Sequence, residues 1–173
     1  MRHGFAVRPV VEAILRHPAL YLGPRMVKSP AVYTAGLLRA LRRGIDTEAW
    51  TWLLQLAGQQ LFYPPNVAGW DDSRWLDTAT FRARWEIAGY AIRPKVLKES
   101  AKHVPGKPDK LVDRARALLG EPTLTGQTEA ALASFARHAL RDADSHWKKQ
   151  QYPPLIENAL RQLLATAPDL QTC

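Results

Sequence analysis

The sequence first shows its character through what it lacks. A single cysteine, Cys173, stands at the last of 173 positions, so the chain cannot form an internal disulfide. No apolar run approaches the roughly 20 residues that a membrane-spanning helix needs. The N-terminal residues also lack the continuous apolar segment of a signal peptide. We therefore expect no membrane span, and the compartment stays open.

Motifs that mark known chemistries are also missing. The sequence contains no Gly-x-Ser-x-Gly, no His-Glu-x-x-His, no phosphate-binding Gly-x-x-x-x-Gly-Lys and no Gly-x-Gly-x-x-Gly. Its five histidines occur without the spacing of a metal site. We therefore expect neither a bound metal nor a cofactor.

Positive charge is in excess, with a net +8, and much of it is local. Eight lysines and arginines face three acidic residues between Arg93 and Arg116. Such a segment attracts nucleic acid, anionic lipid or an acidic protein surface. The same stretch has no aromatic residue to stack on bases, and no helix-turn-helix pattern is evident. Non-specific nucleic-acid binding through 93–116 is therefore an alternative and not our main expectation.

Helical spacing of apolar residues recurs through the chain, which predicts an all-α fold. We expect an irregular bundle of about six to seven helices. They begin at Pro9, run over 30–44 and 46–61, start again after a Thr78 cap, and span 108–119, 127–141 and 153–165. In the first helix Val11, Ile14 and Leu15 are expected to point inward. The third is expected to be covered on both faces, including Trp52 and Leu56, and the fourth to carry Phe81, Trp85 and Ala88 inward.

Three parts follow from this pattern. A helical core takes residues 1–92, and a basic connector with Pro94, Pro105 and Gly106 takes residues 93–107. A C-terminal helical part takes residues 108–173. The two helical parts either form separate domains or share one.

The stretch Leu61–Trp75, LFYPPNVAGWDDSRW, interrupts the helical pattern. Pro64 and Pro65 prevent a helix from continuing, while Asn66 and Gly69 allow the chain to reverse. Five of the six tryptophans fall between residues 50 and 85, which favours an ordered segment. Ordered loops of this length are generally functional. We therefore predict a long, ordered Pro/Trp-rich loop.

A resemblance rests on the same region. The span from Arg25 to Trp85 and the tail LRQLLATAPDLQTC resemble the C-terminal part of the bacterial family known as domain of unknown function 1800. The residues that match its pattern are Gly58, Gln59, Pro64, Pro65, Asn66, Val67, Gly69, Trp70, Trp75 and Arg84. Many members carry Pro-Gly-Gly after the Gly-Trp pair, where this chain has Asp71, Asp72 and Ser73.

The resemblance implies a context but no mechanism. Family members are longer, with an additional helical region before this part, so the chain is expected to be a C-terminal portion or a truncated member. Members are often exported and encoded beside a second, sulfatase-like family. The expected partners are therefore the missing N-terminal region of the same family or a protein encoded nearby.

Two interpretations of the loop remain open beside a purely structural corner. In the first, the chain is a helical binding or assembly module built around residues 61–75. In the second, it is a hydrolase-like enzyme acting on a glycan or an envelope-associated ligand, with Asp71 or Asp72 as acid or base. Candidate ligand-binding residues are Gln59, Asn66, Trp70, Asp71, Asp72, Trp75 and Arg84, the last also as a partner of the carboxylates.

Overall fold

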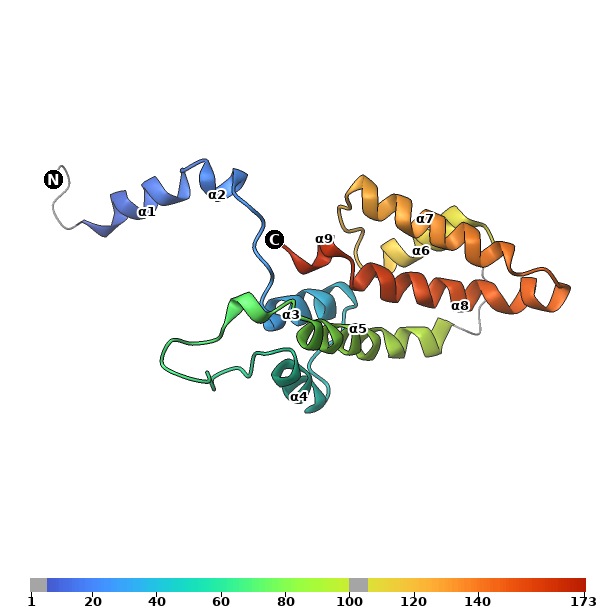
Figure 1. The fold of residues 1–173 in the computed structure, drawn as a ribbon, viewed down its shortest axis with the longest axis horizontal. Coiled ribbons are helices and arrows are strands. Elements are labelled where there is room, and N and C mark those ends of the chain that lie inside the picture. Colours follow the sequence, from blue (N-terminus) through green and yellow to red (C-terminus); the bar gives the residue numbers. More distant parts are fainter. Residues whose placement is uncertain (1–5, 100–105) are drawn as a thin grey trace.

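The computed structural model describes residues 6–99 and 106–173, without the side chains of residues 94–99. Regular structure in these residues is helical except for one isolated antiparallel bridge, so the predicted all-α fold is confirmed (Figure 1). The helices are α1 (Val7–Leu15), α2 (Ala19–Leu22), α3 (Pro30–Ala40), α4 (Ala49–Leu56), α5 (Thr78–Glu99), α6 (Pro108–Leu118), α7 (Gly126–Arg141), α8 (His146–Ala165) and α9 (Pro168–Gln171), with one 3-10 turn, η1 (Asp72–Arg74).

The described residues thus hold nine α-helices, more than the six to seven expected. The two that the sequence missed, α2 and α9, have four residues each. A single helical turn is too short to establish a periodic pattern.

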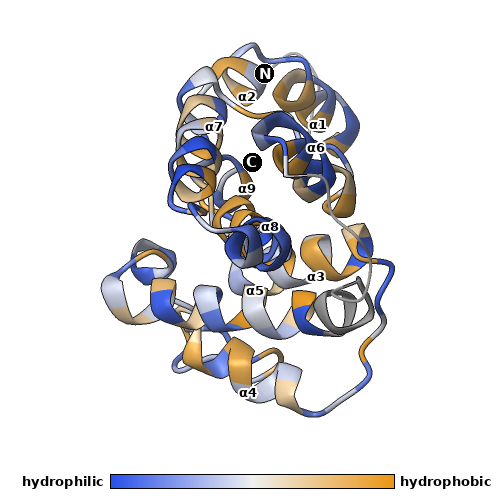
Figure 2. Cartoon of the chain, turned by 90° about the vertical axis from the view of Figure 1, so that its right-hand side faces the viewer, coloured by the Kyte–Doolittle hydropathy of each residue, from blue (hydrophilic) through white to orange (hydrophobic). Residues whose placement is uncertain are grey.

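Two groups of helices meet along α5 and α8. Helix α5 packs against α3, α4 and α8, while α6 and α7 pack on each other and on α8. One cluster of buried apolar residues passes through both groups and includes Leu37, Trp50, Ile87, Leu111 and Leu160. Figure 2 shows hydrophobic and hydrophilic residues mixed along the helices, as is typical of helices with one buried face. The division into 1–92 and 108–173 as domains stays a prediction.

Helices α1 and α2 form an arm that extends away from the other helices (Figure 1). Neither contains a buried residue. Val11, Ile14 and Leu15 are 46%, 57% and 54% exposed, so the expectation that they enter the core is wrong. Their spacing does mark an apolar helical face. The rest of the described chain leaves that face open.

Helix α3 begins where the sequence predicts. The Ser29 hydroxyl accepts a hydrogen bond from the backbone N of Val32 at 3.3 Å, and Pro30 occupies the first turn. The helix ends at Ala40, four residues before the expected Gly44. Arg42 beyond it has a positive φ of 51°, which ends the helical path.

Helix α4 is covered on one face only. Trp50 and Leu53 are buried, as predicted, but Trp52 and Leu56 on the opposite side are exposed. The prediction of cover on both faces is therefore wrong. The helix also ends earlier than expected, at Leu56, because Gly58 reverses the backbone with a φ of 90°.

Helix α5 begins as expected but is capped one residue earlier. The carboxylate of Asp77, and not the side chain of Thr78, accepts the hydrogen bond from the backbone N of Thr80, at 2.9 Å. Ala88 is buried as predicted, whereas Phe81 and Trp85 are partly exposed, at 38% and 44%. These two aromatic residues therefore border the core without entering it.

The basic connector is partly helical. Helix α5 runs through Pro94 to Glu99, so the first seven residues of the predicted 93–107 segment continue a helix. Residues 100–105, including Pro105, lie outside the described residues. Helix α6 then begins at Pro108, as predicted, with proline in its first turn.

The segment after the arm pairs with the end of the chain. Met26 and Cys173 exchange backbone hydrogen bonds of 3.1 and 3.0 Å, and Lys28 N donates to the carbonyl of Gln171 at 2.8 Å. Val27 and Thr172 form the isolated bridge between them. This pairing brings Gln171 and the backbone of Lys28 to the side of α5 that carries Arg84.

Candidate functional site: the loop between α4 and α5

The first base of the loop is built into the core. Gln59 is 7% exposed, and its Oε1 accepts a hydrogen bond from the backbone N of Ala31 at 2.9 Å. Ala31 lies in the first turn of α3, whose backbone N–H groups have no partner within the helix. Gln59 is preceded by Gly58, where a Cβ would lie 3.8 Å from Cδ1 of Trp75. The predicted ligand-binding residue Gln59 therefore joins the loop to α3.

The tip of the loop is exposed. Residues 61–68 all lie at the surface, and Phe62, Tyr63 and Val67 are 96%, 71% and 109% exposed. Asn66 turns the chain, because its side-chain Oδ1 accepts a hydrogen bond from the backbone N of Ala68 at 2.8 Å. Gly69 completes the turn with a φ of 92°. The tip thus has a defined backbone turn and carries apolar side chains directed into solvent.

The two tryptophans of the loop lie between the tip and the core. Trp70 and Trp75 are each half-buried. Their indole Nε1 atoms are inaccessible to solvent and find no hydrogen-bond partner among the described residues. Such groups normally bind a protein atom or a water. The tryptophans therefore act mainly as packing residues at the base of the tip, and their ring faces are only partly open to a ligand.

Asp71 and Asp72 lie at the surface in and beside η1. The Asp71 carboxylate accepts hydrogen bonds from the backbone N and the hydroxyl of Ser73, at 3.1 and 2.5 Å. It thereby closes a local turn of its own chain. General acid–base chemistry needs a carboxyl group close to a bound substrate, away from bulk water. The exposure of both carboxylates gives the enzyme interpretation little support.

Arg84 anchors the second base of the loop. It is 0% exposed, and its Nε donates to the carbonyl oxygen of Trp75 at 2.9 Å. Its Nη2 donates to the carbonyl of Lys28 at 2.7 Å, and its Nη1 donates to Oε1 of Gln171 at 3.1 Å. The structure therefore brings Arg84 to Trp75 and not to Asp71 or Asp72. All three acceptors are neutral, so burial lowers the pKa of Arg84.

Sequence reasoning missed the partners of Arg84. The Arg84 guanidinium carbon lies 5.3 Å from the ring centroid of Tyr33, within the range of a cation–π contact. Burial raises the pKa of Tyr33 to about 12, against the opposing effects of Gln171 and Arg84. The Tyr33 hydroxyl and the Gln171 amide both donate to the carbonyl of Ala165. Pairs separated by more than 80 residues leave no local signal in one sequence.

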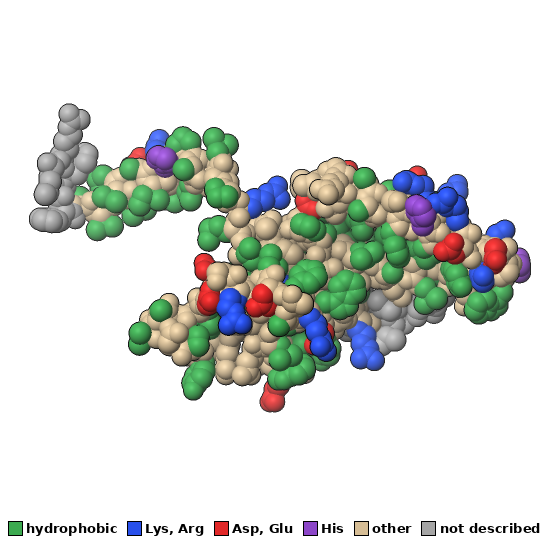
Figure 3. Space-filling model, in the orientation of Figure 1, with side chains coloured by type: hydrophobic (Ala, Val, Ile, Leu, Met, Phe, Trp, Pro, Cys, Tyr) green, Lys and Arg blue, Asp and Glu red, His purple; other side chains and the backbone are tan. Residues whose placement is uncertain are grey.

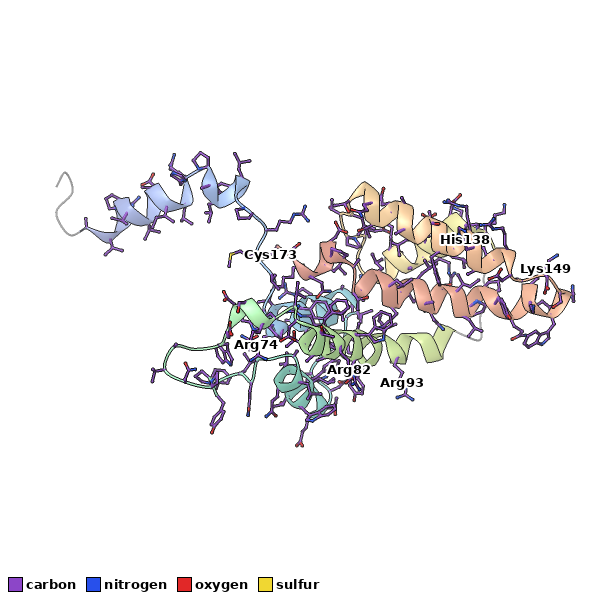
Figure 4. The ribbon with its side chains drawn as sticks, in the orientation of Figure 1. Arg74, Arg82, Arg93, His138, Lys149 and Cys173 are labelled. Atoms are coloured by element: carbon purple, nitrogen blue, oxygen red, sulfur yellow. The ribbon has the colours of Figure 1, made fainter. Side chains whose placement is uncertain are left out.

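The described basic side chains of 93–116 are largely paired. Arg114 binds Glu157 at 2.9 Å, and Arg116 binds Glu129 at 3.0 Å. Lys110 lies 3.6 Å from Asp113. Arg93 projects from the far end of α5 in Figure 4, away from the loop tip and from Arg74 at η1. The charge excess is therefore not one continuous basic surface in this part of the chain.

The described residues contain no group of three His, Cys, Asp or Glu side chains arranged to hold a metal ion. Of the helices within 6–99 and 106–173, none combines the length and apolar character needed to cross a bilayer.

Comparison with protein families gives one match. A family model described as "Protein of unknown function (DUF1800)" matches residues 1–172, which includes the basic segment where the resemblance was silent. Neither a comparison with curated proteins nor one with solved structures gives a match.

Proposed function

We propose that this chain, which belongs to the DUF1800 family of proteins of unknown function, is a helical binding and assembly module whose loop contacts another protein. The observation that carries the proposal is the exposure of Phe62, Tyr63 and Val67 at the tip. Isolated apolar residues on a surface are ordinary, but a contiguous group on one loop is typical of an interaction site.

Both ends of the loop support this interpretation. Gln59 fixes the loop to α3, and Arg84 fixes Trp75 to α5 and to the C-terminus. A loop that is already anchored loses less conformational entropy on binding than a loop without such contacts. Aromatic side chains such as Phe62 and Tyr63 are enriched among residues that carry interface energy.

The N-terminal arm offers a second apolar surface. Between α1 and α2 lies an open hollow of about 700 Å³, lined by Pro9, Val10, Ala13, Ile14, His17 and Leu20. In Figures 1 and 3 the arm and the loop extend beyond the helix bundle at the same end of the molecule. Figure 3 shows hydrophobic side chains along the arm. One partner with an apolar helical surface can therefore cover both.

The partner that fits best is the helical region that precedes this part in longer family members. A helical region of that kind has apolar faces that need cover, and the arm and the tip are apolar surfaces without one. In a truncated member the partner is a separate protein, and in a longer chain it is the preceding segment.

The test is a titration of this chain with the N-terminal region of a longer family member, followed by isothermal calorimetry. Phe62→Ser should weaken binding by about tenfold, since removal of an interface anchor typically costs 1–2 kcal/mol or more. Leu155→Ser is the matched control, because Leu155 is 62% exposed on α8, away from the loop. Equal affinities for the wild type and Phe62→Ser would contradict the proposal.

A further inference from the structure

A cleft between α3 and α4 carries an inference that is independent of the loop tip. It has a volume of about 300 Å³, at the lower end of the range for small-molecule sites. Its walls include Thr34, Ala35, Leu38, Arg39, Trp50 and Leu54. We infer that this cleft binds a small aromatic monoanion, with its anionic group at Arg39 and a hydroxyl group at Thr34.

Thr34 supplies the first observation. It is 4% exposed, and its hydroxyl oxygen is buried without a hydrogen-bond partner among the described residues. A buried hydroxyl without a partner is costly, and the great majority of such groups in proteins are satisfied. Because Thr34 lines the cleft, a polar group of an occupant is the partner that the site provides for.

Arg39 supplies the second. It is exposed in the last turn of α3 and forms no ion pair within the described part of the chain. Its neighbour Arg43 also lines the cleft but is already engaged, by Asp46 at 2.8 Å and by the carbonyl of Tyr90 at 2.6 Å. Arg39 is therefore the cation available to an anion, and a guanidinium suits the two oxygens of a carboxylate.

The distance between these groups sets the length of the ligand. Thr34 and Arg39 are five residues apart on one helix, which is about 7.5 Å along its axis at 1.5 Å per residue. Between them the cleft wall is apolar, with Ala35 and Leu38 on α3 facing Trp50 and Leu54 on α4. A flat apolar body with a carboxylate at one end and a hydroxyl at the other fits this order of groups.

The test compares two probes that differ in one hydroxyl, para-hydroxyphenylpropanoate and phenylpropanoate, by isothermal calorimetry on the intact chain. The hydroxylated probe should bind about tenfold more tightly, since it satisfies a buried donor and acceptor. Thr34→Val should abolish that preference without lowering the thermal unfolding midpoint, because it replaces an unpaired hydroxyl with a methyl group. Thr34→Ser should retain the preference.

Arg39→Gln should weaken both probes by about tenfold. Arg42→Gln is the matched control, since Arg42 is exposed three residues along and does not line the cleft. The inference is overturned if neither probe binds at millimolar concentration. It is equally overturned if Thr34→Val keeps the preference, or if the two arginine variants weaken binding alike.

Discussion

Arg84 and Gln171, which are 87 residues apart in sequence, are joined by a 3.1 Å hydrogen bond from Nη1 of the arginine to Oε1 of the glutamine. The remaining donors of the same guanidinium reach the backbone carbonyls of Trp75 and Lys28. One buried side chain thus connects the end of the loop, the segment before α3 and the C-terminus. An arginine in this position orients the loop and is not itself available to a ligand.

Substitution of Arg84 should therefore affect stability strongly. Arg84→Lys keeps the charge but lacks the planar fork, so it cannot satisfy all three acceptors. We expect the free energy of unfolding to fall by about 3 kcal/mol, measured by urea denaturation. Arg82→Lys is the control, since Arg82 is exposed on the same helix, and it should change stability by less than about 0.5 kcal/mol. Equal effects of the two variants would contradict the anchoring role of Arg84.

Gly58 should resist substitution for a backbone reason. Its φ of 90° is unfavourable for any residue with a Cβ, although the added atom would meet Thr80 Cγ2 only at 3.5 Å, an ordinary contact. Gly58→Ala should thus lower the free energy of unfolding by about 1–2 kcal/mol. Gly36→Ala, in the middle of α3 with open space around it, should raise that free energy by about 0.5–1 kcal/mol. Opposite signs in thermal or urea unfolding check the pair.

Glu157 is the buried carboxylate of the α6–α8 interface. It is 2% exposed and forms ion pairs with Arg161, which is also buried, and with Arg114 on α6. Glu157→Gln removes the negative charge from between the two arginines and should cost about 3 kcal/mol of unfolding free energy. The exposed pair of Arg82 and Glu86 offers a comparison: Glu86→Gln should change stability by less than about 0.5 kcal/mol in the same assay. A cost for Glu157→Gln below that of Glu86→Gln would refute the assignment.

Asp46 should make stability depend on pH in the acid range. Hydrogen bonds from the Arg43 side chain and then from Trp50 lower the pKa of Asp46 from 3.8 to about 2. A folded pKa below the unfolded value means that the contribution is present above pH 3.8 and disappears as pH falls toward 2. The stability difference between the wild type and Asp46→Asn, followed by urea unfolding, should therefore shrink over that interval. A difference that stays constant down to pH 2 would show that Asp46 is not perturbed.

Sequence reasoning located most of the helices because their apolar residues recur with helical spacing. It failed where the outcome depends on what covers a face. The apolar positions Val11 and Ile14 of α1 are real, yet the described chain does not bury them. The start of α8 was expected at Pro153, since proline favours a first turn, but the helix begins seven residues earlier at His146 and contains that proline. Its capping residue, Ser145, accepts a hydrogen bond from the backbone N of Lys148.

The candidate site was predicted in part. The turn at Asn66 and Gly69 follows from the local preferences of these residues, and the structure has it. The structural partners of Gln59 and Arg84 were not predictable, because they lie 28 and more than 50 residues away in sequence. Residue type alone made both look like ligand-binding groups. Whether the loop residues bind a ligand or a protein stays a prediction.

The most direct test of the central proposal is amide hydrogen exchange of residues 61–70, with and without the N-terminal region of a longer family member. In the free chain these amides should exchange rapidly, since the tip is exposed and only Ala68 and Gly69 donate hydrogen bonds within the turn. The proposal predicts that the complex slows exchange at the tip and along α1, while the exposed end of α8 near Lys149 is unchanged (Figure 4). Complex formation with no change at residues 61–70 would contradict the proposed role of the loop.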